Sequence, residues 1–318
     1  MRIATLVPAY KPKYLVELLT SLRHQTVKPD RVIFSDDSPD QAFVATLNSE
    51  PLKSMIADLN VSVVPGPRSG AYNNFLHLMK LWNGETELFH LLLDDDIIYP
   101  PFYERHLHAH ASGRISCSIS RRWTATETGV PLRDLPVPAI INTNSNRILA
   151  LDAGVLFATT AAISSNWLGE YSNVVLRADM ADIVSDPRIE SIAYTGLEDL
   201  GAFLSASLRA PVAYINDHLG YFRTSAQQHS ADPMGRPMKL AHLAYLALAI
   251  AGRRIGQITQ TQFENCMAGL CPVVPARYGN EADMAPFCAL MPELAKASPA
   301  AEAKFLEAWR AFLKRVQA

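Results

Sequence analysis

The chain has 318 residues, of which 49% are hydrophobic and 19% charged, and its formal net charge is −2. This composition supports a large packed core and excludes a mostly disordered chain. The small net charge and the lack of a long basic run argue against a nucleic-acid partner.

Strand-like and helix-like segments alternate along the first hundred residues. Each short apolar run is followed by a segment with apolar residues at helical spacing. The expected strands are 3–9, 31–37, 61–66 and 87–95, and the expected helices lie within 13–25, 41–59 and 69–82. This order predicts βαβ units and a mainly parallel sheet, in which ligands bind at the carboxyl ends of the strands.

The later elements are less regular. We expect strands at 113–124, 147–160, 211–217 and the start of 218–233, a loop at 127–146, a helix at 195–210, and helices from 238 onward. A boundary near residue 235 divides an α/β domain, 1–235, from a helical region, 236–318, that provides packing, oligomer or membrane contacts.

The cysteines and the apolar segments predict the cellular compartment of the protein. The four cysteines fit no zinc-binding spacing, which indicates free thiols in a reduced compartment. The first residues do not resemble a signal peptide, and no apolar run reaches the ~20 residues of a membrane span. We therefore expect a cytoplasmic protein.

The tail, 300–318, has the pattern of a basic amphipathic helix. Its apolar face would comprise Phe305, Leu306, Trp309, Phe312 and Leu313. One hypothesis is peripheral contact with the inner face of a membrane. The alternative is packing against the catalytic region or against a second subunit in a homo-oligomer.

Three consecutive acids, Asp94, Asp95 and Asp96, follow the fourth expected strand. Adjacent carboxylates repel one another, and a hard divalent ion such as Mg²⁺ or Mn²⁺ would relieve this repulsion. On an extended backbone, Asp94 and Asp96 point to the same side. The sequence therefore predicts a metal site, with a solvated turn or a helix N-cap as the alternative.

Other polar residues follow neighbouring strands. Asp36 and Asp37 could accept the imide N–H of uracil or thymine, or form an Asx turn. Arg68 could reach a phosphate or lie free on the surface. Glu198 and Asp199 lie near a helix N-terminus, which favours the ionised form. They could act as a general base, or only stabilise the helix.

Five motifs in a fixed order carry a family resemblance over roughly residues 1–230. They are "ATLVPAYKPKYLVELLTSLRHQTVKPDRVIFSDDSPD", "PGPRSGAYNNF", "LLLDDDIIYP" with its Asp-x-Asp pattern, "GLEDLGAFL" and "DHLGYFRTSAQQHS". Together they resemble bacterial-type, inverting family 2 glycosyltransferases of the GT-A fold. That resemblance implies a Rossmann-like, mixed but mainly parallel sheet flanked by helices, here with a C-terminal helical extension.

The resemblance also implies roles for individual residues. The nucleotide-sugar site would comprise Pro8, Tyr10, Asp36, Asp37, Arg68, Asp94, Asp95 and Arg223, and the metal would be bound by Asp94, Asp96 and His229. Asp199 would be the catalytic base, with Glu198 beside it. The family's usual histidine two residues after the arginine is Ser225 here, so either His229, or less readily His218, would replace it, or the metal would have no imidazole ligand from the protein.

The predicted function is metal-dependent, inverting transfer of a sugar from a UDP or dTDP donor to a hydroxyl group. The acceptor would be a glycan, a lipid-linked molecule or a protein, as in surface polysaccharide assembly. The alternative is a non-catalytic scaffold that binds glycan or nucleotide. A nucleotidyltransferase is disfavoured because the N-terminus lacks a glycine-rich loop followed by Arg and Lys.

Overall fold

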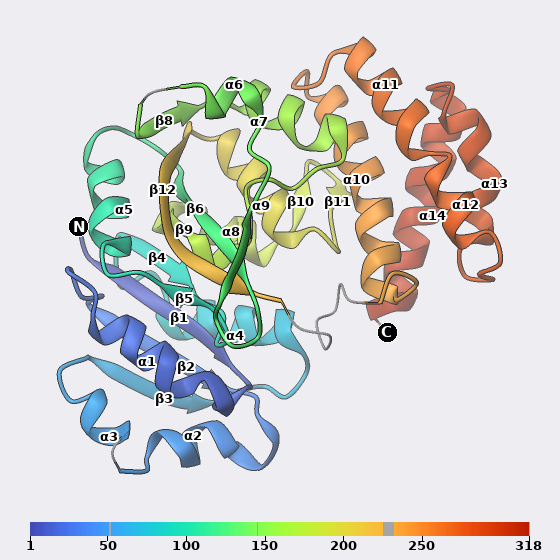
Figure 1. Cartoon of the computed structure of the whole chain (residues 1–318). Helices are drawn as coiled ribbons and strands as arrows, with labels where there is room; N and C mark the ends of the chain where they lie inside the picture. Colours follow the sequence, from blue (N-terminus) through green and yellow to red (C-terminus); the bar gives the residue numbers. More distant parts are fainter. Residues whose placement is uncertain (51, 145, 225–231, 318) are drawn as a thin grey trace. The chain divides into compact units, whose positions relative to one another are not determined.

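The computed structural model describes residues 1–50, 52–144, 146–224 and 232–317 (Figure 1). Contacts divide the chain into two units. The sheet unit comprises Met1–Leu151, Leu168–Ser185 and Arg209–Ser225, and the helical unit comprises Asp152–Trp167, Asp186–Leu208 and Ala226–Ala318. The helical unit thus contains two segments that precede the expected boundary near residue 235.

A mixed sheet forms the centre of the sheet unit (Figure 1). Its strands, in spatial order, are β3 (Val61–Pro65), β2 (Arg31–Asp36), β1 (Ile3–Ala9), β4 (Leu88–Leu91), β9 (Val174–Arg177), β6 (Cys117–Ala125), β12 (Val212–Arg223) and β5 (Ile97–Ile98). β7 (Pro131–Asp134) pairs with β6, and β8 (Ile148–Leu151) pairs with β12. The first four strands in this order are mutually parallel, whereas β9 is antiparallel to both of its neighbours.

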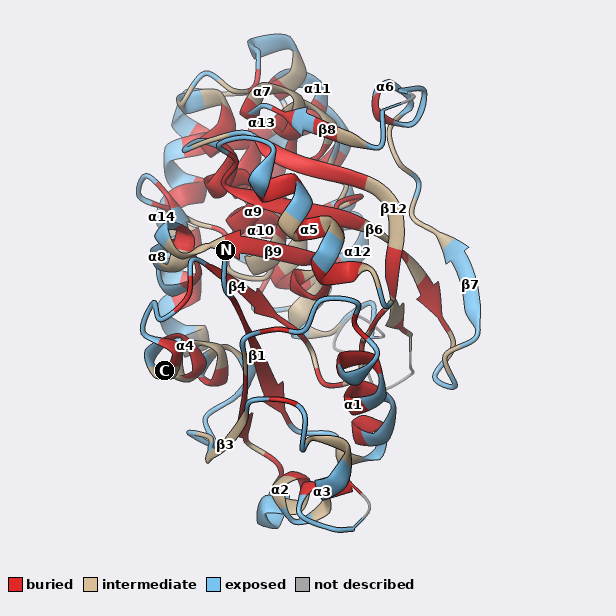
Figure 2. Cartoon of the chain, turned by 90° about the vertical axis from the view of Figure 1, so that its left-hand side faces the viewer, coloured by how far each residue is buried: buried red, intermediate tan, exposed pale blue. Residues whose placement is uncertain are grey.

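The helices of the sheet unit differ in length and in how much apolar surface they bury. They are α1 (Leu15–Arg23), α2 (Ala42–Leu47), α3 (Leu52–Met55), α4 (Ala71–Trp82), α5 (Phe102–Ala111), α6 (Ala139–Asn142) and α8 (Ala181–Ser185). In α1, Leu15, Leu18, Leu19 and Leu22 have the three- and four-residue spacing of a single face, and all four are fully buried. Figure 2 shows the central strands as buried and β7 as exposed.

The helical unit contains α7 (Ala153–Thr159), α9 (Glu198–Ser207), α10 (Arg236–Arg254), α11 (Gln260–Leu270), α12 (Val273–Tyr278), α13 (Ala285–Leu294) and α14 (Pro299–Gln317). A short hairpin, β10 (Arg188–Ile189) and β11 (Ile192–Ala193), belongs to the same unit. Each of the four cysteines is a free thiol, as predicted.

The apolar face of α14 is buried. Phe305 and Phe312 contact Phe287 of α13, with ring centroids 5.8 and 5.5 Å apart. Trp309 is 1% exposed, and its indole N–H donates to the Ala193 carbonyl at 2.9 Å. The structure therefore favours packing over membrane contact for this face. No helix within the described residues is long and apolar enough to span a membrane.

Three sequence expectations differ from the structure. Within 147–160 only Ile148–Leu151 is a strand, because Asp152 caps the following helix by accepting the Val155 N–H at 2.8 Å. The expected loop at 127–146 contains β7 and α6. The two expected strands after residue 211 are one long strand, β12, with register shifts where it pairs with β6.

Candidate functional site

The carboxyl ends of β1, β2, β3, β4, β6 and β12 lie at the same edge of the sheet, together with the amino end of β9. This follows from the parallel pairing of β1–β4 and of β6 with β12, and from the antiparallel position of β9 between the two groups. We call this edge the acidic rim, because the loop after β4 carries Asp94–Asp96 there. The predicted strand-end residues of the sheet unit therefore do share one edge.

Asp94 joins the loop after β4 to the loop after β1. Its Oδ2 accepts hydrogen bonds from the backbone amides of Tyr10 and Lys11, both at 2.5 Å. The side chain is buried, and burial raises the pKa of Asp94 to about 6, although the two amide hydrogen bonds oppose the rise. Burial and the neighbouring Asp95 charge thus disfavour ionisation unless a cation is present.

Asp96 is the most deeply buried acid of the triplet. Its Oδ1 accepts the Arg223 backbone N–H at 3.3 Å, and its Oδ2 has no hydrogen-bond partner among the described residues. Burial, then the negative charge of Asp95 and to a smaller extent that of Glu170, raise the pKa of Asp96 well above its usual value, while a side-chain hydrogen bond with Ser172 and the charge of Arg122 oppose the rise. Asp95 itself pairs with the Lys11 ammonium group.

The triplet is a turn, which corrects the extended backbone assumed from the sequence. β4 ends at Leu91, and the Asp96 amide donates to the Leu93 carbonyl at 3.2 Å. Asp94 and Asp96 are consequently oriented by their hydrogen bonds to neighbouring loops. The alternation of side chains along a strand does not determine their direction.

The acid pair fits a hard cation in its donor atoms. Asp94 and Asp96 are buried carboxylates with raised pKa values, and Asp96 has one oxygen without a hydrogen-bond partner among the described residues. A divalent cation nearby would stabilise the ionised form of both groups. Mg²⁺ commonly takes one or two carboxylates and completes its shell with substrate phosphates and water. In the part of the chain that the structure describes, no group of three His, Cys, Asp or Glu side chains could hold a metal. His229 lies outside the described residues.

Arg223 is fully engaged with protein groups. Its Nε donates to the Asp95 carbonyl at 2.7 Å, its Nη1 donates to the Glu127 carbonyl at 2.8 Å, and Nη2 pairs with Glu17. The guanidinium also lies over the Tyr14 ring, 4.5 Å from the centroid. The structure therefore gives Arg223 a role in fixing the turn of the acid triplet.

The two acids after β2 have different surroundings. Asp36 accepts hydrogen bonds from the amide and hydroxyl of Ser38 and from the Val44 amide, at 2.5–2.9 Å, and is 1% exposed. These contacts are those of an Asx turn that caps α2. Asp37 instead accepts the Arg68 backbone N–H at 2.6 Å and so connects the loops after β2 and β3.

The backbone of the loop after β3 lies close to the Asp37 side chain. A Cβ atom on Gly66 would lie 2.3 Å from Asp37 Oδ1, so a larger residue there would displace the Asp37 carboxylate. Arg68 has a φ of 53°. Of the two remaining residues of the predicted nucleotide site, Pro8 is buried within β1, and Tyr10 is 55% exposed.

Glu198 and Asp199 form the first turn of α9 in the helical unit. Glu198 Oε1 accepts the Gly196 amide at 2.9 Å, and Asp199 Oδ1 accepts the Leu200 amide at 2.7 Å. Both acids are half-buried. Burial first, and the Asp199 charge second, raise the pKa of Tyr245. The helix start is as predicted, and the catalytic roles of both acids remain predictions.

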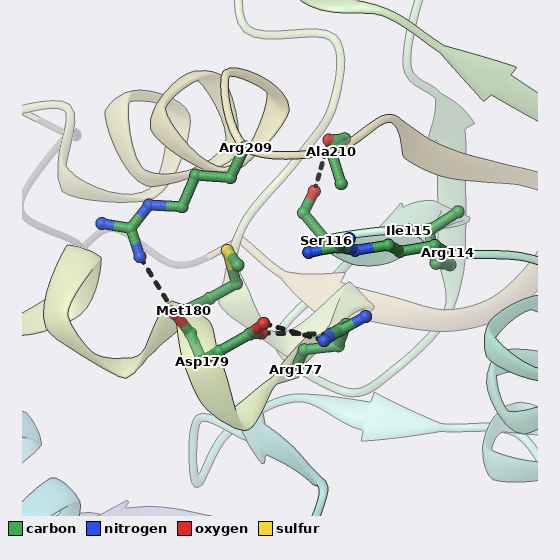
Figure 3. Close-up of a pocket in the computed structure, with 8 residues that line it drawn as sticks. All are labelled: Arg114, Ile115, Ser116, Arg177, Asp179, Met180, Arg209 and Ala210. Atoms are coloured by element: carbon green, nitrogen blue, oxygen red, sulfur yellow. Dashed lines mark hydrogen bonds and ion pairs between the residues drawn. The ribbon is translucent and has the colours of Figure 1, made fainter.

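Figure 3 shows the residues that line a cavity of about 240 Å³. They lie before β6 and β12 and at the end of β9, which places the cavity at the opposite edge of the sheet from the acidic rim. Arg177 and Arg209 line it, and each forms a two-point ion pair, with Asp179 and Asp182 respectively. Of the predicted site residues that the structure describes, none lines this cavity.

Sequence reasoning missed a buried ion pair at the acidic rim. Arg122 on β6 is 5% exposed and pairs with Glu170, which immediately precedes a 3₁₀ turn, Tyr171–Asn173. The signal was a pair of arginines inside the expected strand 113–124, in "SCSISRRWT". A charge at an inward position of a central strand indicates a buried partner.

The mixed, mostly parallel sheet flanked by helices, with β9 antiparallel between β4 and β6, has the architecture of the GT-A glycosyltransferase fold. A sequence model described as "Glycosyl transferase family 2" matches residues 5–171, which is more than half of the chain. The chain therefore belongs to glycosyl transferase family 2 and is a glycosyltransferase.

Solved structures support the fold. S. aureus TarS 1–349 in complex with UDP-GlcNAc matches with a TM-score of 0.55 and 17% identity, covering 100% of this chain and 92% of that one. The mannosyltransferase PcManGT from Pyrobaculum calidifontis, in complex with GDP-Man and Mn²⁺, matches with a TM-score of 0.58 and 12% identity, covering 98% and 87% respectively. Among curated proteins, no sequence matches significantly.

Proposed function

We propose that this protein transfers a sugar from a nucleotide-diphosphate donor to a hydroxyl acceptor in a metal-dependent, inverting reaction. The observation that carries the proposal is the buried pair Asp94 and Asp96 after β4, with Asp96 Oδ2 unpartnered among the described residues. Family membership supports it, as do structural neighbours in complex with UDP-GlcNAc or with GDP-Man and Mn²⁺.

Asp94 and Asp96 would hold a divalent cation, Mn²⁺ or Mg²⁺. When bound, such a cation neutralises the charge that develops on the departing nucleotide diphosphate. Asp94 is held in place by two backbone amides, and the turn is held by Arg223. These contacts pre-organise the carboxylates, which lowers the cost of ordering the site when the donor binds.

The nucleoside would lie over the loops after β1, β2 and β3. Both Asp36 oxygens already accept hydrogen bonds from Ser38 and Val44, so we assign Asp36 to shaping the loop. Asp37 and Arg68 are then the candidates for contacts with a uracil or thymine ring and with a phosphate. This assignment favours UDP or dTDP donors over GDP donors.

On the acceptor side, Asp199 would remove the proton from the attacking hydroxyl as the new glycosidic bond forms. A carboxylate at the first turn of a helix stays ionised near neutral pH and so can accept a proton. Glu198 would help to form the acceptor site. The acceptor would be a hydroxyl of a glycan, a lipid-linked molecule or a protein, in glycan or surface polysaccharide assembly.

The proposal is tested by calorimetric titration of the full chain with UDP, dTDP, GDP and CDP. Each nucleotide is measured with Mn²⁺ and again with EDTA. We expect UDP or dTDP to bind only with Mn²⁺. If a folded protein, checked by circular dichroism, binds none of the four, the donor proposal is wrong. Incubation with UDP-sugars should then also give no donor hydrolysis.

A further inference from the structure

Two positively charged side chains contact the acid triplet, and the protein holds them in different ways. Among the described residues they are Arg223 and Lys11. The Arg223 side chain is 2% exposed, and its three nitrogens donate to the Asp95 carbonyl, the Glu127 carbonyl and Glu17. Arg223, which the family resemblance placed at the nucleotide-sugar site, is therefore committed to protein groups.

Lys11 contacts the acid triplet through both its backbone and its side chain. Its amide donates to Asp94 Oδ2 at 2.5 Å, and its ammonium group pairs with the Asp95 carboxylate. The amide contact fixes the start of the side chain beside Asp94, which the proposed function assigns to the cation. The ammonium group therefore lies next to the site in which a metal and a diphosphate would bind.

The Lys11 side chain is accessible to solvent although its ammonium group is paired. It is 44% exposed, whereas the Asp95 side chain is 16% exposed. An ammonium group has three N–H donors, and within the described residues the hydrogen bond to Asp95 uses one of them. The flexible four-carbon stem lets the group turn toward a new acceptor without movement of the backbone. Lys11 can thus donate to a ligand while the amide contact with Asp94 stays in place.

The positive charge of Lys11 is suited to an exchange of partners. Burial opposes this charge, but the hydrogen bond with Asp95 and the charges of Asp95 and Asp94 outweigh burial and raise the pKa of Lys11. The ammonium group thus stays charged at neutral pH and offsets part of the repulsion between the acids. A divalent cation held by Asp94 and Asp96 would take over that task and repel the ammonium group. A phosphate bound to the same cation would attract it.

We propose that Lys11 is a donor-binding residue that changes partner. Its ammonium group pairs with Asp95 before a cation binds, and with the donor diphosphate once a cation is held by Asp94 and Asp96. This inference rests on the proposed function, which supplies both the cation and the diphosphate. Lys11 would couple the binding of the two, because it disfavours the cation alone and favours the cation together with the diphosphate.

Lys11→Met in the full chain tests this role, because methionine keeps the backbone amide that donates to Asp94 and removes the charge. In calorimetry with Mn²⁺, the diphosphate that the wild type binds, UDP or dTDP, should bind the variant about 10–100-fold more weakly, since a charged hydrogen bond is lost. The corresponding nucleoside should bind both proteins equally. Without nucleotide, Mn²⁺ should bind the variant roughly 3–10-fold more tightly, as measured by electron paramagnetic resonance of free Mn²⁺.

Lys13→Met is the matched control, because Lys13 lies two residues further along the same segment and pairs with the exposed Glu127. It should change none of these affinities. A residue that only supported the fold would, when replaced, weaken the binding of Mn²⁺, nucleoside and diphosphate together, so a uniform loss in Lys11→Met would overturn the inference. Unchanged diphosphate binding, or Mn²⁺ binding that does not tighten, would overturn it as well. If the folded wild type binds neither diphosphate with Mn²⁺, the proposed function itself fails, which is a separate result.

Discussion

The backbone amide of Arg223 donates to Asp96 Oδ1 at 3.3 Å, while the Arg223 side chain holds the Asp95 carbonyl at 2.7 Å. One residue at the end of β12 therefore contacts two consecutive acids at the end of β4. These strands are separated in the sheet by β9 and β6. The position of the acids consequently depends on the correct assembly of the whole central sheet.

Arg223→Lys should disturb this turn without removing the positive charge. Lysine has one compact ammonium group and cannot donate to both the Asp95 and Glu127 carbonyls while lying flat over Tyr14. We expect the free energy of unfolding to fall by about 2–4 kcal/mol, since hydrogen bonds from a charged donor to buried carbonyls are lost. Urea unfolding measures this change.

Nucleotide binding in the same variant should also weaken, because the acids lose their support. Arg147→Lys is the matched control, since the Arg147 side chain is exposed and, among the described residues, its one ion pair is a long contact with Asp217 at 3.9 Å. If Arg223→Lys unfolds at the wild-type urea concentration and still binds Mn²⁺ and UDP normally, the supporting role is wrong.

Asp96→Asn should separate metal binding from stability. The substitution removes a buried carboxylate whose ionisation is disfavoured by burial and by Asp95, so the metal-free protein should become more stable at pH 8. Mn²⁺ should no longer raise the melting temperature. The Asp95 carboxylate pairs with Lys11, so it is not expected to bind the cation. Asp95→Asn should therefore keep most of the rise in melting temperature that Mn²⁺ causes. A Mn²⁺-induced shift that survives in Asp96→Asn would exclude Asp96 as a ligand.

The sequence predicted those helices and strands whose own residues show a clear apolar run or a helical spacing. The strands β1–β3 are short apolar runs, and α1 and α4 have clear helical spacing, so they were found close to their observed bounds, whereas β4 ends four residues before its expected end at residue 95. β9 was missed because four residues, "VVLR", give little periodicity, and their antiparallel position between β4 and β6 is a tertiary property. The helix α7 was read as strand because an apolar run does not show that Asp152 caps it.

The candidate site was partly predictable for the same reason. Residues that follow strands are visible in the sequence, so the acids at the end of β4 could be placed at the correct edge. A turn at Asp94–Asp96 was only the alternative interpretation, and its orientation could not be predicted, because backbone amides from the loop after β1 hold Asp94. The Arg122–Glu170 pair joins residues that are distant in the chain, and only the sheet order brings them together.

The pKa of Asp94, raised from 3.8 to about 6, predicts a pH dependence of stability. The folded state binds this proton more tightly than the unfolded state. The resulting stabilisation is complete below about pH 4 and is lost as the pH rises through about 6. The shift of roughly two units corresponds to about 3 kcal/mol.

Asp94→Asn isolates this contribution, because asparagine stays neutral and its carbonyl can still accept from Tyr10 and Lys11. We expect the variant to gain about 3 kcal/mol relative to the wild type between pH 4 and pH 7.5 in metal-free buffer. Urea unfolding at several pH values measures the difference. A difference that does not change with pH would show that Asp94 has an ordinary pKa.

Trp309→Ala tests whether the apolar face of α14 packs within the protein or contacts a membrane. Trp309 is 1% exposed and bonded to the Ala193 carbonyl, so its loss should lower the free energy of unfolding by about 3–5 kcal/mol. Binding to anionic lipid vesicles, measured by co-sedimentation, should stay at the wild-type level. If vesicle binding falls while stability is retained, α14 contacts membranes through this face.

Asp199→Asn should abolish sugar transfer and leave donor binding intact. Asparagine can still accept the Leu200 amide, which keeps the start of α9, but it cannot take a proton from the acceptor hydroxyl. Loss of a general base lowers the rate by about 10²–10⁴-fold. Glu198→Gln is the matched control, because it changes the adjacent acid in the same helical turn, and it should lower acceptor affinity more than the rate.

Two measurements separate a loss of catalytic base from a loss of substrate binding. They are the transfer rate at saturating donor and the calorimetric Kd for the donor nucleotide with Mn²⁺. Asp199→Asn with a wild-type Kd and a rate reduced at every acceptor concentration would fit a base. Transfer at the wild-type rate would remove Asp199 from the mechanism. A weakened nucleotide Kd would instead assign Asp199 to the donor side, since a base that acts only on the acceptor does not contribute to nucleotide binding.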